Sequence, residues 1–153
     1  MKEDKMKMIS MESFQWLIQH ELGYIYGYVI MANHIHVLWE QLKMNGKETP
    51  KESFEKYTGH IFLKQLKKSG DKLSDYKAEQ KDRNYIFWQR DPLAILITST
   101  IMAGEKLDYI HYNPLQPHWQ LCQDPTEYRF SSVMFYETGD EEFKILTHYI
   151  DKL

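Results

Sequence analysis

The stretch YVIMANHIHVLWE, residues 28–40, holds two histidines one residue apart inside a run of strand-forming residues. Side chains at positions i and i+2 of a strand point to the same face, so His34 and His36 are expected side by side. Two adjacent imidazoles can chelate a divalent metal when a third ligand comes from elsewhere in the chain. Because an H-x-H pair alone is a weak signal, two half-buried histidines bonded to backbone groups are the alternative.

The composition fits one globular domain over residues 1–153, with 42% hydrophobic and 27% charged residues. The single cysteine, Cys122, excludes an internal disulfide and a cysteine-based zinc site. No apolar run reaches the roughly 18 residues of a membrane span, and the N-terminal MKEDKMKMIS lacks the apolar region of a signal peptide. We therefore expect a cytoplasmic protein with no membrane partner.

Two strands are expected around the histidine pair, over residues 22–30 and 34–40, antiparallel and joined at Ala32-Asn33. Helical spacing predicts a preceding helix over residues 10–20, capped by Ser10, with four apolar residues on one side: Met11, Phe14, Leu17 and Ile18. A second helix is expected over residues 51–68, with Phe54, Tyr57, Ile61 and Leu66 on one side.

Further along the chain, residues 69–84 are polar and are expected to be irregular. Leu93–Thr98 (LAILIT) predicts a short buried strand, and a helix capped by Thr98 or Ser99 is expected to run to about Tyr112, where Pro114 stops it. A closing amphipathic segment is expected from its apolar residues: Phe143, Leu146, Tyr149 and Ile150. Helices packed on an antiparallel sheet make this an α+β chain.

The second candidate motif is KLDYIHYNP, residues 106–114. Tyr109 and Asn113 are four residues apart, hence on one face of the predicted helix. A tyrosine oxygen attacks a phosphate more readily when a metal neutralises the phosphate charge, and the amide oxygen of Asn113 could complete the metal site. With eleven tyrosines in the chain, ordinary packing is the alternative for Tyr109; Tyr112 is a rival nucleophile, whereas His111 points elsewhere.

A mildly basic middle segment could contact phosphates, although the whole chain has a net charge of −3. Residues 43–91 hold 12 Lys/Arg and 8 Asp/Glu. We expect DNA contacts from six residues of this segment: Lys56, Lys64, Lys67, Lys68, Trp88 and Arg90. A solvated helix face is the alternative for the lysines, and core packing is the alternative for Trp88.

Together these motifs resemble the single-tyrosine HUH transposases, specifically their REP-associated tyrosine transposase branch. Three blocks match in order: YVIMANHIHVLW, KLDYIHYNP and DPTEYRFSS (residues 124–132). The resemblance covers roughly residues 10–150. It is specific because the H-x-H pair is followed some seventy residues later by D-Y-I-H-x-N-P.

The resemblance implies a ferredoxin-like antiparallel sheet with helices packed on it. His34 and His36 match the metal-binding pair, Tyr109 the nucleophile and Asn113 the third metal ligand. The implied activity is cleavage and rejoining of single-stranded DNA near hairpins, through a 5′-phosphotyrosine link. The implied cofactor is Mg²⁺ or Mn²⁺, and two imidazoles with an amide suit Mn²⁺ rather better.

One departure concerns the first strand of that fold, which should precede the first helix. Only the nine residues MKEDKMKMI do so here, and they show no strand alternation. We therefore expect the first strand to be lacking, leaving one edge of residues 34–40 unpaired. A 5′-truncated gene, an upstream start or a swapped strand in a homodimer would each account for this, whereas the branch resembled implies a monomer.

Three functions follow as alternatives. The first is a metal-dependent DNA strand transferase, and the second is a non-catalytic remnant that binds single-stranded or hairpin DNA. The third is a histidine-nucleophile phosphoesterase, which the sequence disfavours. Leu38 stands where the histidine-triad hydrolases need a third histidine, and no second H-x-Ser/Thr is present.

Overall fold

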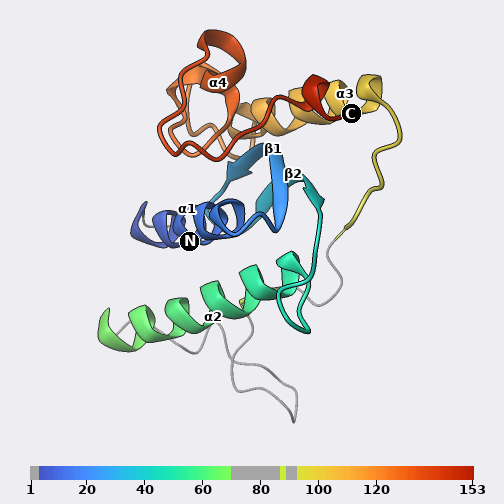
Figure 1. The fold of residues 1–153 in the computed structure, drawn as a ribbon. Helices are drawn as coiled ribbons and strands as arrows, with labels where there is room; N and C mark the ends of the chain where they lie inside the picture. The colour runs from blue at the N-terminus through green and yellow to red at the C-terminus, as the bar shows by residue number, and fades with distance from the viewer. Residues whose placement is uncertain (1–3, 70–86, 89–92) are drawn as a thin grey trace.

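The computed structural model describes residues 4–69, 87–88 and 93–153 (Figure 1). Its helices and strands are, in chain order, α1 (Asp4–Gln19), β1 (Gly23–Ile30), β2 (Ile35–Gln41), α2 (Pro50–Ser69), α3 (Thr100–Tyr112) and α4 (Val133–Thr138). The single turns of 3₁₀-helix within these described residues are η2 (Asn113–Leu115), η3 (Pro125–Glu127) and η4 (Tyr149–Asp151). The α+β class is thus confirmed.

Strands β1 and β2 form an antiparallel pair, as expected, in the register Val29↔His36 and Tyr28↔Val37. The register shifts between Ile25 and Gly27, which leaves Tyr26 as a bulge residue. The Tyr26 hydroxyl donates to Glu40 Oε2 at 2.6 Å, so the bulge is tied to the opposite strand. Because the side chains of a strand alternate, one face of the sheet receives His36 and the other receives Val37.

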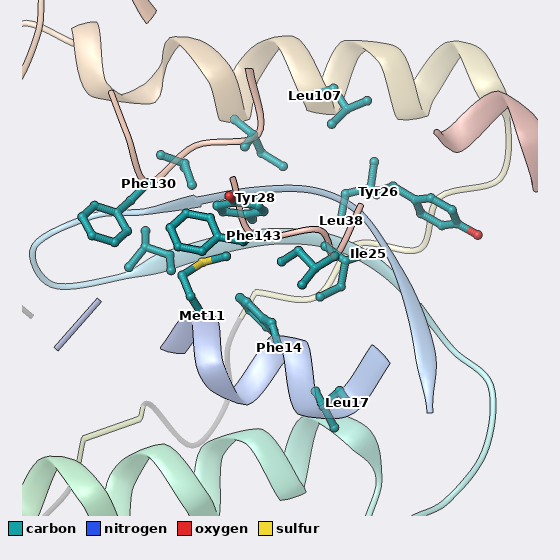
Figure 2. Packing of buried hydrophobic residues seen from close by; sticks show 14 of the residues in the cluster. Met11, Phe14, Leu17, Ile25, Tyr26, Tyr28, Leu38, Leu107, Phe130 and Phe143 are labelled. Atoms are coloured by element: carbon teal, nitrogen blue, oxygen red, sulfur yellow. The ribbon is translucent and has the colours of Figure 1, made fainter. Parts of the chain in front are cut away.

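Helices cover the two faces of this small sheet in layers (Figure 1). Helix α3 lies on one face, α1 lies on the other, and α2 packs on the far side of α1. The apolar residues expected for the first helix point to the sheet: Met11, Phe14 and Leu17 are buried, and Ile18 packs against the core. Figure 2 shows Phe14 of α1 and Leu107 of α3 reaching the sheet from opposite sides.

The close approach of α3 to the sheet depends on Gly27 in β1. A Cβ atom at this position would lie 2.1 Å from Leu107 Cδ2 and 3.2 Å from Ser132 Oγ. Leu107 is therefore seated over a position that only glycine leaves open. This contact brings the middle of α3 directly over the strand pair.

The segment after α3 covers the free edge of β1. Isolated bridges pair Val29 with Ser131 and Ile25 with Leu146. The Tyr128 hydroxyl donates to the backbone oxygen of Ile30 at 2.8 Å, which fixes this segment near the end of β1. Among the described residues, the outer edge of β2 pairs with no strand.

Two of the expected elements differ in the structure, namely the first helix and the strand over residues 93–98. Helix α1 begins at Asp4, so Ser10 lies buried inside the helix and does not cap it. The physical reason is tertiary: Met6 and Ile9 pack against Phe62 of α2, which stabilises six additional helical residues. The helix also leaves no strand among residues 4–9, in agreement with the expected lack of a first strand.

Residues 93–98 form no strand and are mostly exposed, contrary to the expected buried strand. Leu93 is 91% and Leu96 is 81% exposed, while Ile97 packs against the core. A strand needs a neighbour to pair its backbone, and this apolar segment has none among the described residues. The described sheet is therefore smaller than a ferredoxin-like one.

The remaining boundaries agree closely with expectation, with two differences in burial. Helix α2 buries Phe54 and Phe62 but leaves Tyr57 half exposed. The closing segment packs Phe143 and Leu146 on the core, while Ile150 is exposed and only residues 149–151 are helical. The expected irregular stretch, residues 69–84, lies outside the described residues except for Ser69, which ends α2.

Candidate functional site

The two histidines lie at the start of β2, on the face of the sheet that carries α3. His34 directly precedes the strand, where its backbone oxygen accepts a hydrogen bond from Met31 N at 2.9 Å. His36 is in the strand, opposite Val29. Their ring centroids are 4.9 Å apart and the rings are nearly perpendicular. The sequence expectation that the two imidazoles lie side by side is met in this geometry.

The protonation of the two imidazoles suits metal binding. Burial lowers the pKa of His36, and the neighbouring His34 lowers it further. Burial also lowers the pKa of His34, an effect that the nearby Asn113 side chain opposes. His34 Nδ1–H donates to Asn33 Oδ1 at 2.7 Å, so its Nε2 keeps a free lone pair. Neutral imidazoles are the form that binds a metal ion.

Tyr109 comes to the histidines from α3. The helix begins at Thr100, and the side chain of its N-cap residue, Ser99, accepts a hydrogen bond from Met102 N, as expected. The Tyr109 ring lies 5.4 Å from the His36 ring, edge to face at 79°. Tyr109 is 54% exposed, so the residue can be reached from solvent. The rival Tyr112 is 56% exposed and makes no ring contact with either histidine.

Asn113 ends α3 and begins η2, where the following proline belongs to the same turn. The residue is only 4% exposed. Its Oδ1 atom is buried and meets no hydrogen-bond donor at bonding geometry among the described residues. An unpaired buried oxygen costs free energy, so such an atom calls for a ligand or another explanation.

The donor set fits a divalent metal ion. It comprises the neutral imidazoles of His34 and His36 and the buried amide oxygen of Asn113, whose side chain interacts with His34. Imidazole suits manganese better than magnesium, which prefers an all-oxygen set. Within residues 4–69, 87–88 and 93–153, no group of three or more His, Cys, Asp or Glu residues could hold a metal ion. Asn113 is not one of those residue types, and its buried Oδ1 atom is the candidate third donor beside the two imidazoles.

His111 takes no part in this site, as its sequence position indicated. Its Nε2 atom lies 2.8 Å from Ser132 Oγ in the buried interface between α3 and β1. Burial lowers the pKa of His111 to about 4, against a smaller raising effect of Asp108. A neutral, buried histidine in this place holds α3 to the sheet.

Trp119 is a site residue that sequence reasoning missed. Its ring lies 5.4 Å from the His34 ring, with an interplanar angle of 48°. The turn that carries it is fixed by hydrogen bonds from Trp119 N and Gln120 N to Gln116 O. Gln120 adopts a positive φ of 44° in this turn. The signal in the sequence that could have identified Trp119 is its position, as an aromatic residue in the turn that follows Asn113-Pro114 at the end of α3.

The expected DNA-contacting residues lie elsewhere. Lys56, Lys64, Lys67 and Lys68 are on α2, which is separated from α3 by the sheet and α1 (Figure 1). Lys56 forms an ion pair with Glu48. Trp88 packs against Phe54, with ring centroids 5.4 Å apart, and donates its indole N–H to Thr58 at 2.9 Å. Its ring thus serves packing, and Arg90 lies outside the described residues.

The chain was compared with protein-family models, curated proteins and solved structures, and none of these comparisons gave a match. In the described part of the chain, no helix has the length and apolar character required to cross a membrane.

Proposed function

We propose that this protein is a metal-dependent DNA strand transferase that cleaves single-stranded DNA near hairpins with Tyr109 as its nucleophile. The observation that carries the proposal is the edge-to-face contact between Tyr109 and His36. The KLDYIHYNP motif, which supplies the nucleophile, and the H-x-H motif, which supplies metal ligands, are therefore in contact although they are distant in the sequence.

The chemistry assigned to the chain's own residues is a pair of phosphoryl transfers. Tyr109 Oη attacks the scissile phosphorus, a bond forms between Oη and phosphorus, and the bond from phosphorus to the 3′ oxygen breaks. The tyrosine proton passes to solvent, and the leaving 3′ oxygen takes up a proton from solvent to become a hydroxyl. A 3′-hydroxyl later attacks the phosphotyrosine and releases Tyr109, so no nucleotide cofactor is consumed.

His34, His36 and Asn113 are the residues that would hold the ion. When bound, a divalent metal supplies positive charge that polarises the phosphate and neutralises its negative charge. Asn33 holds the His34 ring through Nδ1, and Gly27 lets α3 carry Tyr109 close to the strand. These contacts position the nucleophile before DNA binds, which lowers the entropic cost of attack.

The test is incubation of the purified protein with 3′-labelled hairpin DNA and Mn²⁺, because the DNA on the 3′ side of the cut stays attached to Tyr109. A protein–DNA adduct that survives denaturation is expected, and Tyr109→Phe should abolish it. Tyr112→Phe is the matched control, since it removes an equally exposed hydroxyl three residues away on the same helix. An adduct that persists in Tyr109→Phe would overturn the nucleophile assignment. Hairpin binding without any adduct would instead favour the non-catalytic DNA-binding alternative.

A further inference from the structure

A hollow is lined by residues of α1 and α2. These two helices lie on the side of the sheet opposite α3, the helix that carries Tyr109 (Figure 1). The volume of the hollow is about 520 Å³, within the roughly 300–1,000 Å³ of ligand pockets. We call it the α1–α2 groove. Leu17 and Ile61 lie in its apolar wall. The groove is separate from the histidine–tyrosine site and has no role in the chemistry described above.

Two half-exposed aromatic side chains line the groove from different helices. Trp16 of α1 is 40% exposed and Tyr57 of α2 is 49% exposed. The Trp16 ring is supported by His20, with ring centroids 4.1 Å apart and an interplanar angle of 26°. His20 Nδ1–H donates to Trp16 O at 2.8 Å, which fixes that support. Exposed rings held in this way are suited to stacking with a planar ligand.

Cationic and donor side chains continue from the groove along α2. Lys56 and His60 lie in its lining. Lys64 and Lys68 follow His60 by four and eight residues. Residues four apart share one side of a helix, so these four side chains form a continuous stripe. Glu48 neutralises Lys56, whereas Lys64 and Lys68 are exposed and form no ion pair with any described residue. Such a stripe complements a phosphate backbone.

The groove also presents an unpaired carboxylate, Glu12 of α1. It is exposed and makes no hydrogen bond or ion pair with other described residues. A carboxylate repels phosphate but accepts hydrogen bonds from the exocyclic amino group of cytosine. Rings for stacking, an acceptor for an amino group and a neighbouring cationic stripe together match one nucleobase and its adjoining phosphates.

We propose that the α1–α2 groove binds a base of single-stranded DNA, with the adjoining backbone along the stripe from His60 to Lys68. This inference deepens the proposed function, on which its choice of ligand rests. The base stacks on Trp16 and Tyr57, and Glu12 favours bases with an exocyclic amine over thymine. The protein then holds its DNA at a second point, remote from the bond that Tyr109 cleaves.

The binding test uses the full chain with Tyr109→Phe and a chelator, so that no cleavage occurs. Fluorescence anisotropy measures its affinity for labelled oligodeoxycytidine and oligothymidine of twelve nucleotides. Removing a stacked ring should weaken binding by about tenfold or more in Trp16→Ala and in Tyr57→Ala. Trp16→Phe should restore most of the affinity, and oligothymidine should bind more weakly than oligodeoxycytidine. Changing both Lys64 and Lys68 to Gln should reduce the salt dependence of binding.

The matched control is Ile150→Ala, which removes an exposed apolar side chain on the α3 side of the sheet and should leave affinity unchanged. Circular dichroism checks that each variant is folded. If Trp16→Ala does not fold, the two single variants Tyr57→Ala and Trp16→Phe are compared instead. Wild-type affinity in folded Tyr57→Ala and Trp16→Ala variants would overturn the groove proposal while leaving the Tyr109 chemistry intact. If these variants lose binding but the wild-type protein forms no adduct through Tyr109, the groove proposal stands and the strand-transferase proposal is overturned.

Discussion

Leu107 of α3 occupies the space directly over Gly27 of β1, so that a Cβ atom on Gly27 would lie 2.1 Å from Leu107 Cδ2. The two residues set how closely α3 approaches the sheet. Tyr109 follows Leu107 by two residues, and its ring contacts His36 on the neighbouring strand. A packing contact in the core thus determines where the candidate nucleophile lies.

Gly27→Ala should destabilise the protein by about 1–3 kcal/mol, because an added methyl in a packed core forces side chains or backbone to move. It should also lower adduct formation by displacing Tyr109. Urea unfolding followed by circular dichroism measures the first effect. Leu107→Ala alone should cost about 2–5 kcal/mol, but the double variant should be more stable than the sum of the two losses predicts. Strict additivity would contradict the contact.

Asn113→Ala should lower the affinity for Mn²⁺ at least about tenfold, since even outer-shell partners of metal ligands contribute that much. Asn113→Asp should be less stable than wild type without metal, because it buries a charge at a site only 4% exposed. Mn²⁺ should raise the melting temperature of Asn113→Asp more than that of wild type. Calorimetric titration and thermal melts measure both effects, and Asn45→Ala is the control amide remote from α3. Unchanged Mn²⁺ binding in Asn113→Ala would exclude this residue as a ligand.

Alkaline pH should unfold the protein through its buried tyrosines. Burial raises the pKa of Tyr136 to about 12, and also raises the pKa values of Tyr26 and Tyr28. An unfolded tyrosine loses its proton near pH 10. The folded state therefore holds more protons above pH 10, and its stability, complete below that pH, should fall as pH rises toward 12. Urea midpoints between pH 8 and 11.5 measure this, and Tyr136→Phe should show a shallower fall. Equal slopes in the two proteins would refute the assignment.

Leu93→Ser and Leu96→Ser should change stability by less than about 0.5 kcal/mol each, because both side chains are exposed. Ile97→Ser, directly after Leu96 in the same apolar segment, is the matched control. It should cost clearly more, since Ile97 packs against the core. Urea unfolding of the three variants shows whether residues 93–98 are an exposed connection or a buried strand. In a buried strand, every substitution of an inward-facing side chain would lower the free energy of unfolding.

Local sequence determined the elements that carry the site. The i, i+2 spacing of His34 and His36 predicted that the two imidazoles lie side by side, as they do at the start of β2, and Ser99 and Pro114 marked the limits of α3. These signals are local because alternation along a strand and capping of a helix involve only residues near in the chain. Tyr109 and Asn113 could for the same reason be assigned to one helix face.

Tertiary structure alone decided the rest. Contact of Tyr109 with His36 depends on Leu107 finding the open space over Gly27, eighty residues away in the chain. The lengthening of α1 to Asp4 depends on packing against Phe62, and the failure of residues 93–98 to form a strand depends on the lack of a neighbour among the described residues. Whether a residue is buried or a strand is paired depends on residues that are distant in sequence. Spacing and propensity therefore determined the strand and the helix that carry the site residues, and packing determined that these residues come together.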